Sequence, residues 1–222
     1  MPVDRIRVYC AGPLFNAKEQ EQMRELAEYL EDKGFSTFLP QRDGLELTSV
    51  VGELTRKHVA EHVASDIVSK AIFALDVYQV VKECKAIVVN LNGRVPDEGA
   101  VSEAAIAWCY GKALVAYKAD SRSVFLGRDN PLVAGLFDFR ICASCKEVVA
   151  ELRQALARNR AGVTQTAERA AQLAHYLRLG NRISMALKSE DRVAGVAEVL
   201  FEEIAPGHEL ADGAGQQEAK AI

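Results

Sequence analysis

The strongest constraint on the fold is a run of alternating segments in the middle of the chain. Residues 86–91 (AIVVNL) form a nearly continuous apolar run with the length and β-branched content of a buried strand. A turn-rich loop leads to residues 100–110, which are mostly small and apolar, and Gly111 is expected to end this helix. Residues 114–117 then begin another strand. This order predicts a βαβ unit, and ligands bind at the carboxyl ends of the strands in such folds.

The rest of the chain extends this unit into a regular alternation. Strands are expected at residues 5–10, 35–39, 86–91, 114–117 and 139–142. Helices are expected at residues 17–33, 45–84, 100–110 and 146–158. Residues 41–44 are expected to form a loop, and the long helical segment is expected to divide at a cap formed by Ser65-Asp66. The alternation predicts an α/β fold, with an open parallel sheet of about five strands between layers of helices.

The pattern changes near residue 160. Residues 1–160 are expected to form the α/β domain. Residues 161–205 follow it with Ala, Leu and Val at helical spacing, which predicts an appended helical extension. The tail at 206–222 is rich in Gly, Ala and Gln, a composition typical of disordered segments.

Composition argues against several broad classes of function. The 222 residues carry a formal net charge of −4, which gives no basic footprint for nucleic acid. No apolar run approaches the roughly 20 residues that a membrane span needs, and no signal peptide is evident before the first strand. Five cysteines, an odd number in a chain of this length, favour a reducing compartment. Together these features predict a cytoplasmic protein that binds neither nucleic acid nor membranes.

Glu103 is the first candidate for chemistry, because it is the single acid in the apolar helix at 100–110. A carboxylate is costly to bury there without partners, whereas its alternative role is a charge favoured by the helix dipole. Tyr9, at the carboxyl end of the first strand, could hydrogen-bond Glu103 and hold its orientation. Asp76 and Asp97 could converge on the same crevice and divide the roles of nucleophile and proton donor. Each of these two acids could instead be a solvated charge or a helix cap.

Two other sets of residues point to no further chemistry. Cys142 and Cys145 form a CxxC motif, but it lies late in the chain and lacks a second ligand pair, so neither a redox centre nor a zinc site is expected. The histidines are scattered and are expected at the surface or in packing contacts: His58, His62, His175 and His208.

The turn after the first strand is a candidate for ligand contact. Gly12-Pro13 forces a turn, and Gly12 would let the backbone approach a ligand closely. The chain has neither a GxGxxG nor a GxxxxGK pattern, which argues against a dinucleotide or Walker site.

Taken in order, these residues resemble a known family. The set comprises Tyr9 with the segment 11–16 (AGPLFN), Asp76 ahead of a strand, Asp97-x-Gly99-x3-Glu103 opening a helix, Gly111-Lys112 and Asp129-Asn130. It resembles the nucleoside 2-deoxyribosyltransferases over about residues 6–157. The resemblance implies a flavodoxin-like sheet of five parallel strands, and a homo-oligomer whose active sites are shared between subunits.

The resemblance also implies a role for each matching residue. Glu103 would attack C1′ of a 2′-deoxynucleoside, release the base and hold the sugar as a covalent ester, and an incoming free nucleobase would then take the sugar with overall retention. Tyr9 would position Glu103, while Asp76 and Asp97 would face the nucleobase. Asn130 of a neighbouring subunit would hold the sugar 5′-hydroxyl. No metal or organic cofactor is implied. The expected substrate-binding residues are Gly12, Phe15, Asp129 and Asn130.

Two other functions stay open. The first is hydrolysis of the N-glycosidic bond of 2′-deoxynucleoside 5′-monophosphates. Similar hydrolases tend to have a serine six residues before the nucleophile, where this chain has Asp97, and a carboxylate beside a phosphate dianion is unfavourable. The second is a non-catalytic nucleotide-sensing module, which would have no need of the nucleophile Glu103. The chain is also longer than is usual in the family, and residues 164–204 have no counterpart that we can place.

Overall fold

The computed structural model describes residues 5–122 and 129–160, with residues 174, 178–179, 181–186, 188–191, 195–196 and 199 beyond them. The chain divides into two compact units, residues 1–166 and 167–222. In the second unit, residues 181–186 are helical. The expected disordered tail, most of the expected extension, His175 and His208 lie outside the described residues.

The first unit is built on a sheet of five parallel strands in the order β2-β1-β3-β4-β5. The strands are β1 (Arg7–Ala11), β2 (Ser36–Phe38), β3 (Ala86–Asn90), β4 (Ala113–Tyr117) and β5 (Ile141–Cys142). The central strand β3 is buried at all five positions, as its continuous apolar sequence predicts. The expected α/β architecture is confirmed, and each observed strand overlaps its predicted range.

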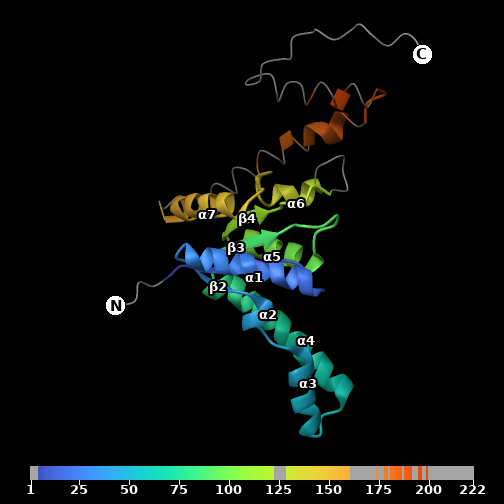
Figure 1. Cartoon of the computed structure of the whole chain (residues 1–222). Helices are drawn as coiled ribbons and strands as arrows, with labels where there is room; N and C mark the ends of the chain where they lie inside the picture. Colours follow the sequence, from blue (N-terminus) through green and yellow to red (C-terminus); the bar gives the residue numbers. More distant parts are fainter. Residues whose placement is uncertain are drawn as a thin grey trace, which may run out of the picture. The chain divides into compact units, whose positions relative to one another are not determined.

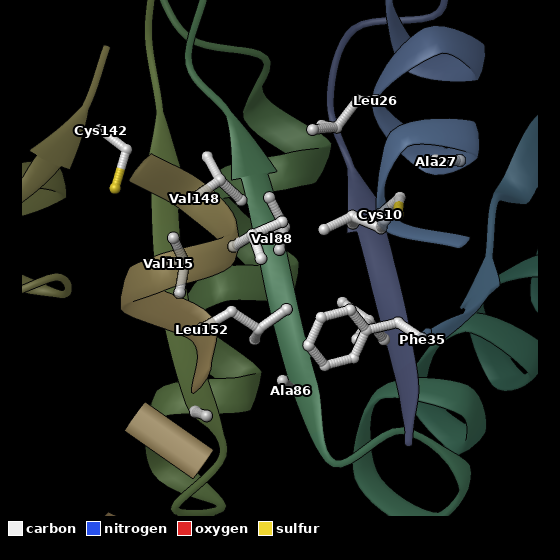
Figure 2. Close-up of a cluster of buried hydrophobic side chains, with 14 of the residues drawn as sticks. Cys10, Leu26, Ala27, Phe35, Ala86, Val88, Val115, Cys142, Val148 and Leu152 are labelled. Carbon is white, nitrogen blue, oxygen red and sulfur yellow. The ribbon is translucent and has the colours of Figure 1, made fainter. Parts of the chain in front are cut away.

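Helices cover both faces of this sheet. Val8 and Cys10 of β1 face a core shared with α1 (Ala17–Asp32) and α7 (Cys145–Arg160), and Figure 2 shows part of it. Tyr9 and Ala11 face a second core, which includes α5 (Glu98–Cys109) and the short helix α6 (Pro131–Gly135). Because successive strand residues point to opposite faces, the same strand supplies both cores.

The helix ends follow the expected chemistry. Asn16 caps α1, because its side chain accepts a hydrogen bond from the Glu19 backbone N–H. Gly34 and Gly111 follow α1 and α5 with φ of 93° and 70°, a left-handed conformation that glycine adopts without strain.

The loop expected at residues 41–44 is wrong, because a short helix, α2, occupies Pro40–Asp43. Pro40 starts this helix at a position where a missing N–H costs nothing. The Asp43 side chain accepts a hydrogen bond from the Leu39 backbone N–H at 2.9 Å, which ties the helix back to the strand before it.

The cap expected at Ser65-Asp66 is also wrong. The long segment divides earlier, into α3 (Leu47–Arg56) and α4 (Glu61–Tyr78), and Ser65 lies inside α4. The break coincides with His58, which has a positive φ of 67°. The α3–α4 pair extends away from the sheet (Figure 1), and α4 continues into a π-helical turn, η1 (Gln79–Glu83). None of the helices formed by the described residues is long and apolar enough to cross a membrane.

Candidate active site

The centre of the site is a hydrogen bond between Tyr9 and Glu103. The Tyr9 hydroxyl donates to Glu103 Oε1 at 2.6 Å, although the two residues are 94 positions apart in sequence. Tyr9 is fully buried, and its ring stacks against Phe38 at a centroid distance of 5.3 Å. The phenol is therefore fixed by packing before it meets the carboxylate. Within the described part of the chain no other hydrogen bond engages the Glu103 carboxylate, so Oε2 can take another partner.

The start of α5 places Glu103 at this point. Asp97 caps the helix, because its side chain accepts a hydrogen bond from the Ala100 backbone N–H at 2.6 Å. Ala100, Ala104 and Ala107 are buried against the sheet. These small side chains let the helix backbone approach the strands closely, so that Glu103 reaches the phenol on β1.

Asp76 joins the pair from α4. Burial raises its pKa, and a hydrogen-bonding interaction with Tyr9 partly opposes that effect. The Asp76 charge in turn raises the pKa values of both Tyr9 and Glu103. The structure thus places Tyr9, Asp76 and Glu103 in direct interaction, and Asp97, the N-cap of α5, close enough for its charge to act on Glu103.

The electrostatics of Glu103 are those of a carboxyl group held out of water. Burial, the largest cause, raises its pKa to about 7, despite the hydrogen bond from Tyr9. The charges of Asp76 and Asp97 act in the same direction as burial. Burial and then the Glu103 charge also raise the pKa of Tyr9, so that the phenol keeps its proton and stays a donor. Perturbed carboxyl groups of this kind cluster at catalytic sites.

The carboxyl ends of β3 and β4 are held by two asparagines that the sequence analysis missed. The fully buried Asn90 accepts a hydrogen bond from the Asn92 backbone N–H at 2.9 Å. Asn92 Oδ1 accepts from the backbone N–H groups of Ala119 and Asp120 at 2.8 and 2.9 Å. The loops that border the crevice are therefore joined by side-chain amides. A polar residue at the end of an apolar strand was the signal that could have found Asn90.

Gly12 has a packing reason to lack a side chain. A Cβ atom there would lie 2.4 Å from Met23 Sδ and 2.8 Å from Asn90 Cβ. The turn after β1 therefore packs directly on α1 and on the end of β3. The next aromatic, Phe15, is 76% exposed and is free of that core.

The remaining expected substrate residues are engaged within their own segment. Asn130 caps α6 by accepting a hydrogen bond from the Leu132 backbone N–H at 2.9 Å. Asp129 forms a buried ion pair with Lys118. Within the described residues, neither forms a hydrogen bond with Tyr9 or Glu103.

A third residue missed from the sequence is Gln79, the first residue of η1. It is buried, and its Oε1 has no hydrogen-bond partner in the part of the chain that the structure describes. The π-helical turn places it three residues after Asp76, and such turns are frequent at functional sites. Amphipathic periodicity gave no signal for it, because a π-helical turn departs from the 3.6-residue repeat.

The residues set aside in the sequence lie apart from this site. Cys142 is a buried free thiol at the end of β5, and Cys145 is a partly buried one at the start of α7. His58 follows α3 and His62 lies in the first turn of α4. No group of three or more His, Cys, Asp or Glu side chains in the described ranges could hold a metal ion.

The fold agrees with comparisons against known proteins. A family model described as nucleoside 2-deoxyribosyltransferase matches residues 8–150, well over half of the chain. The chain therefore belongs to the nucleoside 2-deoxyribosyltransferase family. A comparison with curated proteins gives no match.

Several solved structures are similar to this chain at low identity. A conserved protein from Enterococcus faecalis V583 is 23% identical, with a TM-score of 0.52 over 68% of this chain and 98% of that chain. A 2-deoxyribosyltransferase from Leishmania mexicana is 16% identical, with a TM-score of 0.43 over 65% and 95% of the two chains. A CMP N-glycosidase from Clostridium botulinum is 19% identical, with a TM-score of 0.39 over 66% and 98%.

Proposed function

We propose that this protein is a nucleoside 2-deoxyribosyltransferase, which moves 2-deoxyribose from one nucleobase to another. The observation that carries the proposal is the partly buried Tyr9–Glu103 hydrogen bond of 2.6 Å. A carboxylate with one oxygen fixed and the other available is suited to attack on an anomeric carbon. The substrates are 2′-deoxynucleosides and free nucleobases.

The reaction runs in two displacements at C1′. Glu103 attacks C1′, the bond from C1′ to the base nitrogen breaks, and the departing base takes its electron pair and a proton from an acid. The sugar is then a covalent ester of Glu103. A second base attacks C1′ from the opposite side, loses its proton to the same acid group, and releases the Glu103 carboxylate with net retention.

Asp76 is the better candidate for the proton donor. Burial raises its pKa, which favours the protonated form that a leaving base needs. Asp97, in contrast, is engaged in capping α5, where its side chain accepts a hydrogen bond from the Ala100 backbone N–H. Asp97 is therefore suited to accept hydrogen bonds from the base while Asp76 gives and takes the proton.

The position of Asp97 also supports transfer over hydrolysis of nucleoside monophosphates. The N-terminus of α5 is a natural position for a phosphate dianion, but a carboxylate already occupies its backbone N–H group. A phosphate brought there would meet a like charge. We therefore expect unphosphorylated nucleosides to be the better substrates.

The proposal includes a homo-oligomer with shared active sites. Asp129 and Asn130 are engaged in an ion pair and a helix cap, and neither hydrogen-bonds Glu103 within the described residues. This arrangement supports the expectation that the corresponding segment of a neighbouring subunit completes each site. Sedimentation velocity of the whole chain tests this part directly, and a monomer at assay concentration would contradict it.

The function is tested by separating transfer from hydrolysis in one pair of reactions. The protein is incubated with deoxyinosine plus excess adenine, and with deoxyinosine alone, and the products are resolved by chromatography. Deoxyadenosine in the first reaction, with little hypoxanthine in the second, is the expected result. Equal hypoxanthine in both, with no new nucleoside, would show a hydrolase. Deoxycytidine and cytosine replace the purines if neither reaction proceeds.

A further inference from the structure

A large basic cavity lies at the end of the sheet opposite the catalytic crevice. Its volume is about 770 Å³, within the usual range for small-molecule sites. Its described lining includes four cations and a single carboxylate, with an aromatic ring among them. These residues are Arg5, Arg7, Lys85, Lys112, Glu83 and Tyr110.

The sheet itself gathers these cations. Arg7 begins β1, while Lys85 and Lys112 come directly before β3 and β4. Adjacent parallel strands start at the same edge, so residues that precede different strands become neighbours. The Lys85 backbone N–H donates to the Arg7 carbonyl at 2.9 Å, which joins two of these strand starts.

The positive charge in the cavity is poorly compensated. The Glu83 carboxylate accepts a hydrogen bond from the Tyr78 hydroxyl at 2.6 Å. Among residues 5–122 and 129–160, no ion pair joins a carboxylate to Arg5, Arg7 or Lys85. Burial and then the charge of Lys85 lower the pKa of Lys112, so the cations disfavour one another. A bound polyanion would relieve this repulsion.

Two features of the cavity indicate which class of anion it would bind. Its volume is far larger than one phosphate group requires, and the Tyr110 ring is 63% exposed. An aromatic face beside several cations fits a ligand that has both a planar base and a chain of phosphates. The overall charge of −4 gives no support for a nucleic-acid polymer.

We propose that this cavity binds a nucleoside diphosphate or triphosphate, with its phosphates on Arg5, Arg7, Lys85 and Lys112 and its base on Tyr110. The site is separate from the Tyr9–Glu103 pair and does not depend on the reaction proposed for that pair. It would let the protein respond to a phosphorylated nucleotide while it acts on unphosphorylated nucleosides.

The contacts of Arg7 and Lys112 decide which cavity residues can be changed without disturbing the fold. The Arg7 guanidinium lies 5.5 Å over the Phe38 ring, and Phe38 stacks on Tyr9. Lys112 Nζ donates to the Cys84 carbonyl at 2.9 Å. Changing either residue would disturb the fold or the catalytic pair. The exposed Arg5 and Lys85 are therefore the residues to reverse in charge.

The test is calorimetric titration of the whole chain with three probes: ATP, inorganic tripolyphosphate and adenosine. We expect ATP to bind most tightly, tripolyphosphate more weakly and adenosine least. The double variant Arg5→Glu/Lys85→Glu should weaken ATP binding by at least about tenfold. A control with the same change in net charge, Lys70→Glu/Lys146→Glu, reverses two exposed lysines outside the cavity and should leave the affinity within about twofold.

Each other result overturns the proposal. Loss of affinity in the control equal to that in the cavity variant would mean a nonspecific charge effect. Unchanged binding in the cavity variant would place the nucleotide elsewhere, and no ATP binding by the parent protein would mean no site. Tripolyphosphate binding as tight as ATP binding would remove the nucleoside from the proposal, and Tyr110→Ala should then have no effect. In the proposed site, Tyr110→Ala weakens only ATP binding.

Discussion

The two faces of the sheet are made from alternate residues of the same strands, yet their chemistry differs. The face covered by α1 and α7 is closed by apolar side chains, among them Val88, Val115 and Leu152 (Figure 2). The face covered by α4 and α5 buries Tyr9 next to the carboxylate of Glu103. The first face gains stability from each buried group, whereas the second includes a group that costs free energy to bury.

Because of this difference, we expect the apolar face to contribute to stability and the face with Tyr9 and Glu103 to contribute to function. A partly buried carboxylate whose pKa is raised to about 7 is less stable in its charged form than a solvated one. The apolar face compensates for such a cost without any contact to substrate. Changes on the two faces should therefore have different signatures, one in turnover and its pH dependence, the other in the free energy of unfolding.

The largest expected effect is the loss of turnover in Glu103→Gln. Glutamine keeps an oxygen that can accept the Tyr9 hydrogen bond, but it cannot form the covalent ester. We expect kcat for base exchange to fall by at least about 10⁴-fold. Glu98→Gln, an exposed acid in the first turn of the same helix, is the matched control and should keep most of the activity. Retention of base exchange by Glu103→Gln would exclude Glu103 as the nucleophile.

On the apolar face, Leu152→Ala should act on stability. Leu152 is fully buried between α7 and the sheet, so truncation removes apolar contacts and leaves a cavity. We expect the free energy of unfolding to fall by about 2–5 kcal/mol. Urea denaturation measures it, with the exposed Gln154→Ala on the same helix as control. The pH profile of kcat should be unchanged, and a shifted profile would mean that the two faces are not independent.

The sequence predicted the architecture because the strands are apolar runs of the right length, separated by helical periods that end at Gly34 and Gly111. It also predicted the Tyr9–Glu103 contact, since a single acid in an apolar helix needs a partner. The predictions from the sequence are wrong where the local pattern of residues fits more than one structure. The helix at Pro40–Asp43 has only one turn, and the break before α4 depends on the backbone at His58 rather than on a cap.

The basic cavity was beyond reach of the sequence for a different reason. Arg5, Lys85 and Lys112 each stand before a strand, where a lone cation is an ordinary solvated residue. Only the register of β1, β3 and β4 brings them to one edge. Gln79 was also missed, because the sequence pattern does not predict a π-helical turn. Helical periodicity in the sequence relates residues within one segment. The cavity depends on which residues of different segments become neighbours, and periodicity does not show this.

A pH-dependent gain in stability should accompany the loss of activity in Glu103→Gln. The pKa of Glu103 is about 7 in the folded protein, above its ordinary value of 4.5, so the folded state binds more protons between these values. The stability of the parent protein therefore falls as pH rises from 4.5 to 7, by about 3 kcal/mol at most. Glutamine removes this titration. Urea denaturation at pH 5 and pH 8 should show the advantage of the variant growing with pH, and a constant difference would contradict the raised pKa.

The smallest effect, and the sharpest comparison of the two faces, comes from removing one phenol hydroxyl from each. The hydrogen bond from Tyr9 lowers the pKa of Glu103, so Tyr9→Phe should raise that pKa and move the acidic limb of the kcat/KM profile to higher pH, by about 1 pH unit. At pH 7, kcat/KM should fall by roughly fivefold and largely recover at pH 8.5. Tyr117→Phe at the end of β4 removes a phenol that interacts with Cys145 on the other face, and should leave the profile in place. An equal loss at every pH in Tyr9→Phe would mean that the Tyr9 hydroxyl positions Glu103 without tuning its pKa, and the distinction between the faces would then rest on Glu103 alone.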